Sequence, residues 1–311
     1  MNRGVSLHGG RRLLAGLLIA VALAACSSSS GSSDAGRTDQ LTPPGGSRPF
    51  KLFTPSSYHE GSSMPLVILL HGLGSSGDAV DQYFHLQHLA ASKGFLYVHP
   101  DGTKHPDGAR FWNATDACCG FGSTVDDVAY LTSVIDEVEA VRDVDRSRVF
   151  LMGHSNGGFM SYRMACDLAD RVAAIASVGG ATWADTSRCT PSQPVSVLEV
   201  HGTADPLIKY DGGTMPEASA PFPGARTTIA SWAGYDGCRG ELRQTGDPFD
   251  LDGAVPGKES TASHVDDCPD GIGVELWSVQ GGGHIPRITF ADGTEPMPER
   301  IIDWLFDHPK P

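Results

Sequence analysis

The stretch Arg-Val-Phe-Leu-Met-Gly-His-Ser-Asn-Gly-Gly, residues 148–158, predicts a buried strand, a sharp turn and the start of a helix in immediate succession. After Arg148 it begins with an unbroken apolar run, as expected for a strand covered on both faces of a parallel sheet. The turn Gly153-His154-Ser155-Asn156-Gly157 follows the Gly-x-Ser-x-Gly pattern, whose strained geometry exposes the serine hydroxyl. Its glycines leave room for backbone that a Cβ atom would block. Ser155 is therefore a candidate nucleophile.

On both sides of this turn, apolar strand-like runs alternate with helical patterns. Such alternation predicts an α/β protein with a doubly wound, mostly parallel sheet in a single domain. Strands are expected at residues 65–70, 95–98, 148–152, 172–178, 195–200 and 274–279. Helices are expected at residues 78–93, from a capping pattern at 124–127 to about 141, and at 158–169, 227–235 and 298–306. Between them, residues 210–226 form an irregular insertion.

A serine nucleophile needs a histidine base, and the base needs an acid that holds its tautomer. In this kind of fold the chain order is serine, then aspartate or glutamate, then histidine. Asp205 follows the expected strand 195–200, and His284 follows three glycines after the expected strand 274–279. Asp205 could instead be an ordinary Asp-Pro turn residue. His201 is an alternative base, although it precedes Asp205 and so breaks the order.

The tetrahedral oxyanion formed during acyl transfer needs two preorganised donors, usually backbone N–H groups. One is expected from Asn156, directly after the candidate nucleophile. The other is expected from Leu73, in the glycine loop His71-Gly72-Leu73-Gly74 after the first buried strand. His154, inside the turn, is expected to line the site rather than to act as the base.

The N-terminus has the order of an export signal: three arginines, an apolar run over residues 13–25, and then Cys26. Leu23-Ala24-Ala25-Cys26 resembles the bacterial lipobox, in which the cysteine carries the lipid; the alternative is a plain signal peptide. We therefore expect a lipoprotein signal at residues 1–25, a lipid anchor at Cys26, a flexible Ser/Gly/Pro-rich tether at 26–47 and a catalytic domain at 48–311. The protein would be exported, and only its anchor would contact the membrane.

The formal charge is −14, and it is about −17 without the first 25 residues, which hold three arginines and no acid. Such an acidic chain disfavours nucleic acid and anionic lipid surfaces as partners.

The six cysteines other than Cys26 predict three disulfides, because an even number in an exported chain indicates a disulfide framework. Proximity in the sequence suggests Cys166–Cys189 and Cys238–Cys268, which leaves Cys118–Cys119 as a vicinal pair. No Cys-x-x-Cys pair or His-x-x-x-His spacing accompanies them, so no metal site is expected.

Further motifs surround the turn: Phe111-Trp112-Asn113, Cys118-Cys119-Gly120, Val125-Asp126-Asp127-Val128, His201-Gly202-Thr203-Ala204-Asp205 and Gly281-Gly282-Gly283-His284. Together they resemble the poly(3-hydroxybutyrate) depolymerase and feruloyl esterase group of α/β-hydrolases, and within it the LpqC-like lipoproteins of actinobacteria. The resemblance covers roughly residues 48–308. It implies the α/β-hydrolase fold and a triad of Ser155, Asp205 and His284. It also implies substrates that are esters of hydroxy acids, of ferulic acid or of acetylated polysaccharide.

The chain departs from this group at two places. Ile285-Pro286 follows His284, where polymer-degrading members commonly have Thr-Trp-Pro, and Leu73 stands where a cysteine is frequent. Losing that tryptophan removes an aromatic surface and weakens the polymer prediction. Trp112, Trp183 and Trp232 are alternative aromatic contacts, with Trp112 and Trp183 as candidate pocket residues, although partial burial in the core is the favoured interpretation for each. The pocket itself is expected from loops 103–124 and 206–226. The acidic pair Asp126-Asp127 is expected to cap a helix rather than to act as an acid–base pair.

The resulting hypothesis is an exported serine esterase that forms an acyl-enzyme and needs no cofactor or metal. A peptidase of the prolyl-oligopeptidase kind shares the turn and the residue order, but the chain is too short for an N-terminal propeller. A non-catalytic surface binding protein of the same fold is the second alternative, and such proteins usually lack a triad member.

Overall fold

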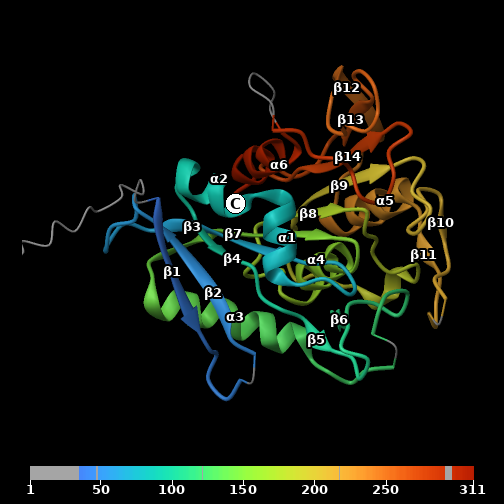
Figure 1. The fold of residues 1–311 in the computed structure, drawn as a ribbon. Coiled ribbons are helices and arrows are strands. Elements are labelled where there is room, and N and C mark those ends of the chain that lie inside the picture. The colour runs from blue at the N-terminus through green and yellow to red at the C-terminus, as the bar shows by residue number, and fades with distance from the viewer. Residues whose placement is uncertain (1–34, 47, 121, 217, 291–295) are drawn as a thin grey trace, which may run out of the picture. The chain divides into compact units, whose positions relative to one another are not determined.

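The computed structural model describes residues 35–46, 48–120, 122–216, 218–290 and 296–311, so the predicted export signal and Cys26 lie outside the described residues. One large sheet runs through this part of the chain in the order β1-β2-β4-β3-β7-β8-β9-β14-β13-β12 (Figure 1). Its strands are β1 (Gly36–Leu41), β2 (Phe50–Pro55), β3 (Met64–Leu70), β4 (Leu96–Val98), β7 (Val144–His154), β8 (Ala174–Val178), β9 (Ser196–Gly202), β12 (Leu242–Phe249), β13 (Ser260–Val265) and β14 (Val274–Val279).

The six central strands, from β4 to β14, are parallel to one another, whereas β1, β2, β12 and β13 pair antiparallel at the two edges. Two short hairpins stand apart from this sheet: β5 (Thr103–Lys104) with β6 (Arg110–Phe111), and β10 (Gly212–Gly213) with β11 (Phe222–Pro223). The predicted doubly wound, mostly parallel sheet is confirmed.

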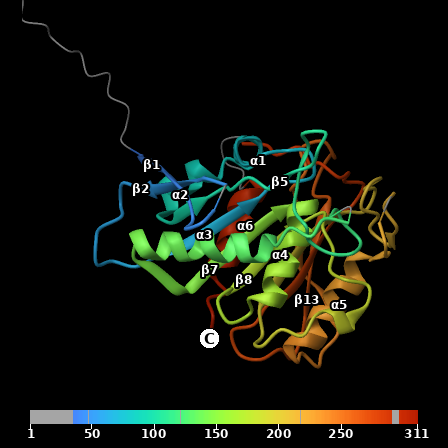
Figure 2. The ribbon, with the colours of Figure 1, turned by 90° about the horizontal axis from the view of Figure 1, so that it is seen from below.

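Helices cover both faces of the sheet because its central strands are apolar on both sides. Along β3, Leu66, Ile68 and Leu70 pack in the core with α3 (Asp127–Val141), α4 (Asn156–Asp167) and α5 (Ala225–Asp236). The alternate residues Val67 and Leu69 pack with α1 (Gly77–Phe84), α2 (Leu86–Lys93) and α6 (Met297–Phe306) on the other side. Figure 1 has α2 and α6 above the sheet, and Figure 2 looks onto the face covered by α3 and α4.

We predicted a flexible tether at residues 26–47, and this prediction is wrong for Gly36–Leu41, which form β1. This strand pairs along its whole length with β2, from Gly36 opposite Pro55 to Leu41 opposite Phe50. Its side chains are half-buried or exposed, so the strand is held mainly by backbone hydrogen bonds at a sheet edge. A polar edge strand has no apolar alternation, and its sequence therefore resembled a linker.

Three other element predictions need correction. The single helix expected at 78–93 is two helices, because His85 takes a left-handed conformation with φ of 55° between α1 and α2. The cap of α3 is Asp126, whose side chain accepts from the Ala129 N–H at 2.9 Å, and not Thr124. The antiparallel strands β12 and β13 were not predicted, since most of their side chains are polar or partly exposed.

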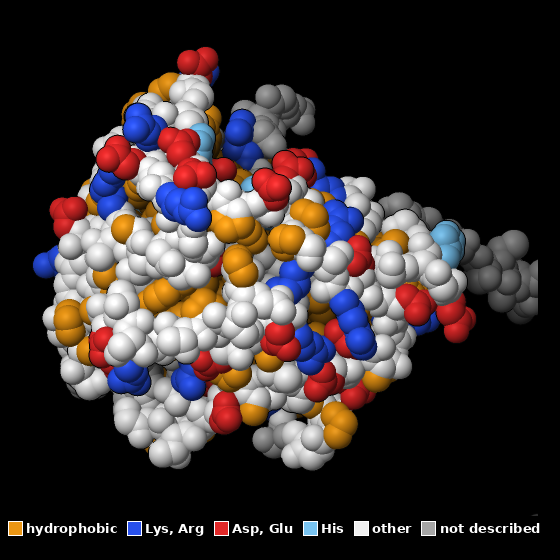
Figure 3. All heavy atoms as spheres, turned by 180° about the vertical axis from the view of Figure 1, so that it is seen from behind, with side chains coloured by type: hydrophobic (Ala, Val, Ile, Leu, Met, Phe, Trp, Pro, Cys, Tyr) orange, Lys and Arg blue, Asp and Glu red, His pale blue; other side chains and the backbone are white. Residues whose placement is uncertain are grey.

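The three predicted disulfides are present. Cys166–Cys189 joins α4 to the chain after the short 3-10 helix Thr186–Arg188, and Cys238–Cys268 joins the end of α5 to the loop after β13. Cys118–Cys119 is the vicinal pair. On the face seen in Figure 3, acidic and basic side chains are interspersed. Within the described ranges, no helix has the length and apolar content needed to cross a membrane.

Asp236, the last residue of α5, should make the free energy of unfolding depend on pH. Burial raises its pKa to about 7; one carboxylate oxygen accepts from the Val195 N–H at 3.0 Å and the other has no partner among the described residues. An unfolded aspartate ionises near ~4, so this group should reduce stability progressively as the pH rises from about 4 to about 7. Asp236→Asn keeps the acceptor and removes the charge. We expect a gain of ~2 kcal/mol in unfolding free energy at about pH 8.

Denaturant unfolding of the wild type and Asp236→Asn at two pH values checks this. The gain should vanish near pH ~4, where both side chains are neutral. An equal difference at the two pH values would contradict the proposed titration of Asp236.

Candidate active site

Ser155 occupies a strained turn between β7 and α4. Its φ of 54° and ψ of −120° lie outside the regions that residues with a side chain favour. The turn is closed by backbone: a Cβ at Gly157 would overlap the Leu70 carbonyl, and one at Gly153 would overlap the Gly157 carbonyl. The Ser155 N–H donates to the Val178 carbonyl of β8 at 2.9 Å. The conformation that the Gly-x-Ser-x-Gly pattern predicts is therefore present, held by the two neighbouring strands.

Asp205 and His284 meet because they follow two strands that are parallel neighbours, β9 and β14. His284 Nδ1 lies 2.7 Å from Asp205 Oδ2, while Asp205 Oδ1 accepts from the Leu207 and Ile208 N–H groups at 2.8 and 2.9 Å. Burial alone would raise the pKa of Asp205, but the hydrogen bond and charge of His284 hold it below its usual value. An ionised Asp205 thus accepts from Nδ1–H of His284, which leaves Nε2 as the basic nitrogen.

His154 connects the serine turn to the His284 loop. Its Nε2 lies 2.9 Å from the His284 carbonyl oxygen, and the two rings are 5.0 Å apart. Burial lowers the pKa of His154 to about 4, so near neutral pH the ring is uncharged and its Nε2–H donates to that carbonyl. Gly179, directly after β8, lies close to the His284 ring: a Cβ at this position would be 3.4 Å from His284 Nδ1. His154 therefore lies at the predicted site and contacts the His284 loop.

His201, the alternative base, is engaged elsewhere. It is buried, with Nδ1 at 2.8 Å from Glu199 Oε1 and Nε2 at 2.7 Å from the Ile208 carbonyl. Burial lowers its pKa, but the hydrogen bond and charge of Glu199 outweigh that effect and raise it. Its Nε2 is also 3.7 Å from Asp205 Oδ2. Since both ring nitrogens are occupied, His201 supports the Asp205 loop and is not available to a serine hydroxyl.

The loop after β3 passes directly beside Ser155. A Cβ on Gly72 would lie 3.4 Å from the Ser155 Cβ and 3.3 Å from His154 Nδ1. The loop is fixed on its far side, where the Gly74 N–H donates to the Arg110 carbonyl at 2.8 Å. Leu73 is 41% exposed. Among the described residues no acceptor is found for the backbone N–H of Leu73 or of Asn156.

The prediction of Trp112 as a pocket residue is wrong: like Trp232 it is wholly buried, so neither side chain forms a substrate surface. The indole of Trp112 instead donates to the carbonyl of His71 at 3.0 Å, which lets it reside in the core. Trp183 is also largely buried, but it borders a cavity.

That cavity has a volume of about 470 Å³ and lies against α4 and the Cys118–Cys119 disulfide; Ser155, Asp205 and His284 are not among its lining residues. Its walls come from α4 and from two loops within the segments expected to shape the pocket, at residues 113–120 with 122–123 and at 215–216 with 218–219. The Cys118–Cys119 disulfide forms part of its wall, and Cys118 Sγ also lies 3.7 Å from Nδ2 of the buried Asn156. Two ion pairs flank it, Arg188 with Asp116 and Arg163 with Asp167, both at 3.3 Å.

These four charged residues were not predicted to lie at a pocket, because they belong to no sequence motif. Their grouping depends on loop conformation: Arg163 of α4 holds the 113–114 segment by donating to the Asn113 carbonyl at 2.6 Å. Over the described ranges, no cluster of three or more His, Cys, Asp or Glu side chains could hold a metal ion.

Comparisons with known proteins identify esterases as relatives of this chain. Residues 50–223 match the family described as Esterase PHB depolymerase, a range that contains Ser155 and Asp205 and ends before His284. Feruloyl esterase D of Neurospora crassa is 29% identical over 309 residues, 94% of each chain. Feruloyl esterase B of Piromyces equi is 29% identical over 236 residues, 74% of this chain, and this chain spans only 41% of its length. The solved acetyl xylan esterase from Aspergillus awamori has a TM-score of 0.59 and 16% identity, covers 88% of this chain and is itself covered completely, and it supports the fold.

Proposed function

Since the chain belongs to the Esterase PHB depolymerase family, we propose that it hydrolyses carboxylic esters with Ser155, His284 and Asp205 as its catalytic triad. The observation that carries this proposal is the 2.7 Å contact between His284 Nδ1 and Asp205 Oδ2, next to a serine in a strained turn. A carboxylate on Nδ1 fixes the tautomer in which Nε2 can accept the serine proton.

The reaction proceeds in two acyl transfers. His284 Nε2 takes the Ser155 proton while Oγ adds to the ester carbonyl, and the N–H groups of Leu73 and Asn156 donate to the oxyanion. Collapse of this intermediate expels the alcohol, which receives the proton from His284 and leaves an acyl-serine. Water then loses a proton to His284 and attacks the acyl group, and a second collapse releases the acid and restores Ser155.

The cavity lined by the Cys118–Cys119 disulfide is proposed to hold the part of the ester farther from the reacting carbonyl, since Ser155 and His284 do not line it. Its disulfide and Trp183 offer apolar surface, while two arginines and two aspartates surround them. This mixture suits a polar, ring-bearing group such as a feruloyl or sugar unit better than a long alkyl chain. Polymer surfaces are a weaker prediction, because the exposed residue after His284 is Ile285 and not an aromatic one.

An ester panel tests the function. We expect turnover of p-nitrophenyl acetate, with methyl ferulate and acetylated xylan hydrolysed faster than 3-hydroxybutyrate oligomers. Anilides matched to the p-nitrophenyl esters should react much more slowly, and a preference for them would indicate a peptidase. A fluorophosphonate probe should label Ser155, and a folded protein that is not labelled would indicate a binding protein.

We also propose that the protein is exported and anchored through Cys26. The three disulfides support this location, since such bonds persist in oxidising compartments. Metabolic labelling with an alkyne fatty acid should tag the wild type and not Cys26→Ser. Labelling of both proteins would contradict the anchor.

A further inference from the structure

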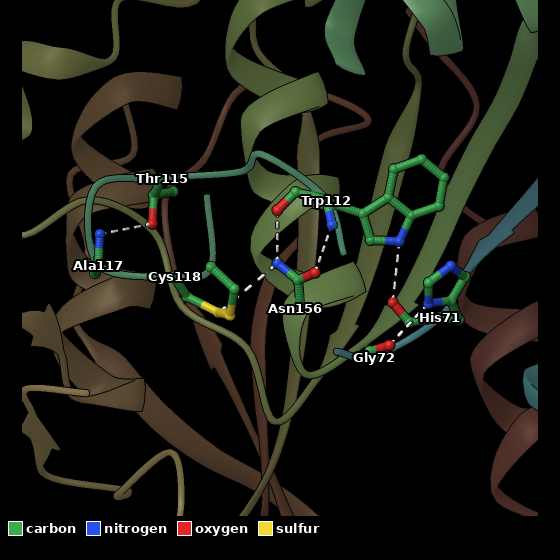
Figure 4. The surroundings of a disulfide bond; sticks show 8 residues. His71, Gly72, Trp112, Thr115, Ala117, Cys118 and Asn156 are labelled. Carbon is green, nitrogen blue, oxygen red and sulfur yellow. Dashed lines mark hydrogen bonds between the residues drawn. A yellow bond between two sulfur atoms is a disulfide. The ribbon is translucent and has the colours of Figure 1, made fainter. Parts of the chain in front are cut away.

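The side chain of Asn156 holds the main chain of Trp112 by both of its polar groups (Figure 4). The Trp112 N–H donates to Asn156 Oδ1 at 2.7 Å, and Asn156 Nδ2 donates to the Trp112 carbonyl at 3.0 Å. Both residues are completely buried. The amide thus bonds to Trp112 as a neighbouring strand would, and the two residues are 44 positions apart in the chain.

The side chain of Trp112 contacts the loop after β3, which carries Leu73. Its indole N–H donates at 3.0 Å to the carbonyl of His71, at the start of the loop that carries Leu73. His71 in turn accepts from the Gly102 N–H at Nε2, at 2.9 Å, and its Nδ1 lies 2.7 Å from the Gly72 carbonyl. Because an amide N–H can only donate, Nε2 is unprotonated and Nδ1–H donates to Gly72. The loop is therefore tied to Trp112 and to its own imidazole.

One residue consequently connects the two segments that supply the oxyanion donors. Asn156 begins α4, Leu73 follows β3, and Trp112 bonds to Asn156 and to His71. We propose that Trp112 and the Asn156 side-chain amide are positioning residues, which fix the separation and direction of the Asn156 and Leu73 N–H groups. This inference rests on the proposed function. It gives Trp112 a role through other residues rather than through contact with substrate.

Burial makes this arrangement stiff. Each polar group of Trp112 and of the Asn156 amide has a partner in a region without exposed surface, where an unpaired group would cost much more than in water. The chain of contacts continues to Cys118, whose Sγ lies 3.7 Å from Asn156 Nδ2 and which lines the cavity. The same amide therefore adjoins both the oxyanion donors and the pocket wall.

Trp112→Phe tests the proposal, because it keeps an aromatic ring in the core and removes the indole donor. Trp232→Phe is the matched control: Trp232 is equally buried, but its indole N–H has no partner among the described residues. Losing an oxyanion donor outright costs ~10²–10³ in kcat, so a displaced donor should cost about tenfold. We expect that loss for Trp112→Phe on p-nitrophenyl acetate with KM within about twofold, and a wild-type kcat for Trp232→Phe.

A transition-state analogue separates positioning from general damage. The tetrahedral adduct of a phenylboronic acid with Ser155 places an oxygen at the oxyanion position, so its affinity should fall in parallel with kcat. Asn156→Leu retains the backbone N–H and removes both side-chain hydrogen bonds. If both substitutions break one network, the double variant should lose little more activity than the worse single variant.

Several results would overturn the inference. These are an unchanged kcat in Trp112→Phe, equal losses in the two tryptophan variants, a raised KM at constant kcat, or fully additive losses in the double variant. If Trp112→Phe does not fold, the affinity of Asn156→Leu for the boronic acid is the test. An affinity equal to that of the wild type would contradict the positioning role. Failure of the proposed function looks different, since the wild type itself would then neither hydrolyse the ester nor bind the boronic acid.

Discussion

Replacing Ser155 with alanine is expected to lower kcat on p-nitrophenyl acetate by roughly 10⁴- to 10⁶-fold while the protein remains folded. The reason is that the substitution removes the only atom proposed to form the covalent bond and leaves the surroundings in place. The Ser155 N–H would still donate to Val178, and the glycines around the turn would still pack on the ends of β3 and β7. Steady-state kinetics with active-site titration by a fluorophosphonate measures the effect.

Two further serine variants make this result specific. Ser161→Ala, one turn along α4, removes a buried hydroxyl whose hydrogen bond goes to the Gly157 carbonyl at 3.0 Å, and it should keep most of the activity. Ser155→Gly should be as inactive as the alanine variant but more stable by ~1 kcal/mol, because glycine accepts the positive φ of this position without strain. Covalent labelling of Ser155→Ala, or rapid ester turnover by it, would show that another residue is the nucleophile.

The central sheet could be predicted because its strands are buried on both faces. An unbroken apolar run such as that of β3 or β9 has few interpretations, and the alternation with helices then predicts parallel pairing. Parallel strands end at the same edge, so the residues after β7, β9 and β14 were expected near one another before any contact was known. The pairing of Asp205 with His284 follows from the adjacency of β9 and β14.

The edges of the sheet could not be predicted from the same signal. β1, β12 and β13 expose much of their surface and are held by backbone hydrogen bonds, which every sequence can make. This is why β1 resembled a tether and why the catalytic domain begins earlier than expected. The break between α1 and α2 at His85 was not predicted either. Residues other than glycine seldom adopt the left-handed conformation, so the sequence gives no signal for it.

The residues around the site were harder still. An aromatic residue next to a motif can face a pocket or fill the core, and for Trp112 the deciding factor is an acceptor 41 residues away, the His71 carbonyl. The cavity wall depends likewise on long-range contacts, such as that between Arg188 and Asp116, 72 residues apart. Patterns within one segment carry no information about such partners. The proximity of Asp205 to His284 could therefore be predicted from motifs and strand order, whereas the shape of the pocket depends on contacts between distant segments.

Asp205→Asn should cause the second large loss, about 10⁴-fold in kcat, without disturbing the loop that carries it. Asparagine keeps an oxygen for the Leu207 and Ile208 N–H groups, which bind Oδ1 at 2.8 and 2.9 Å. Its amide nitrogen then replaces Oδ2, 2.7 Å from His284 Nδ1. An N–H donor at that place requires Nδ1 of His284 to accept, which moves the ring proton to Nε2 and removes the base that Ser155 needs.

The matched control is Asp236→Asn, a second buried aspartate, which lies on α5 and should leave kcat unchanged. The affinity of the Asp205→Asn variant for substrate should change little, because the altered group contacts His284 and not the ester. Retention of more than about a tenth of the wild-type kcat would mean that Asp205 does not determine the tautomer. Glu199 is another buried acid in this region: it contacts His201, whose Nε2 lies 3.7 Å from Asp205 Oδ2.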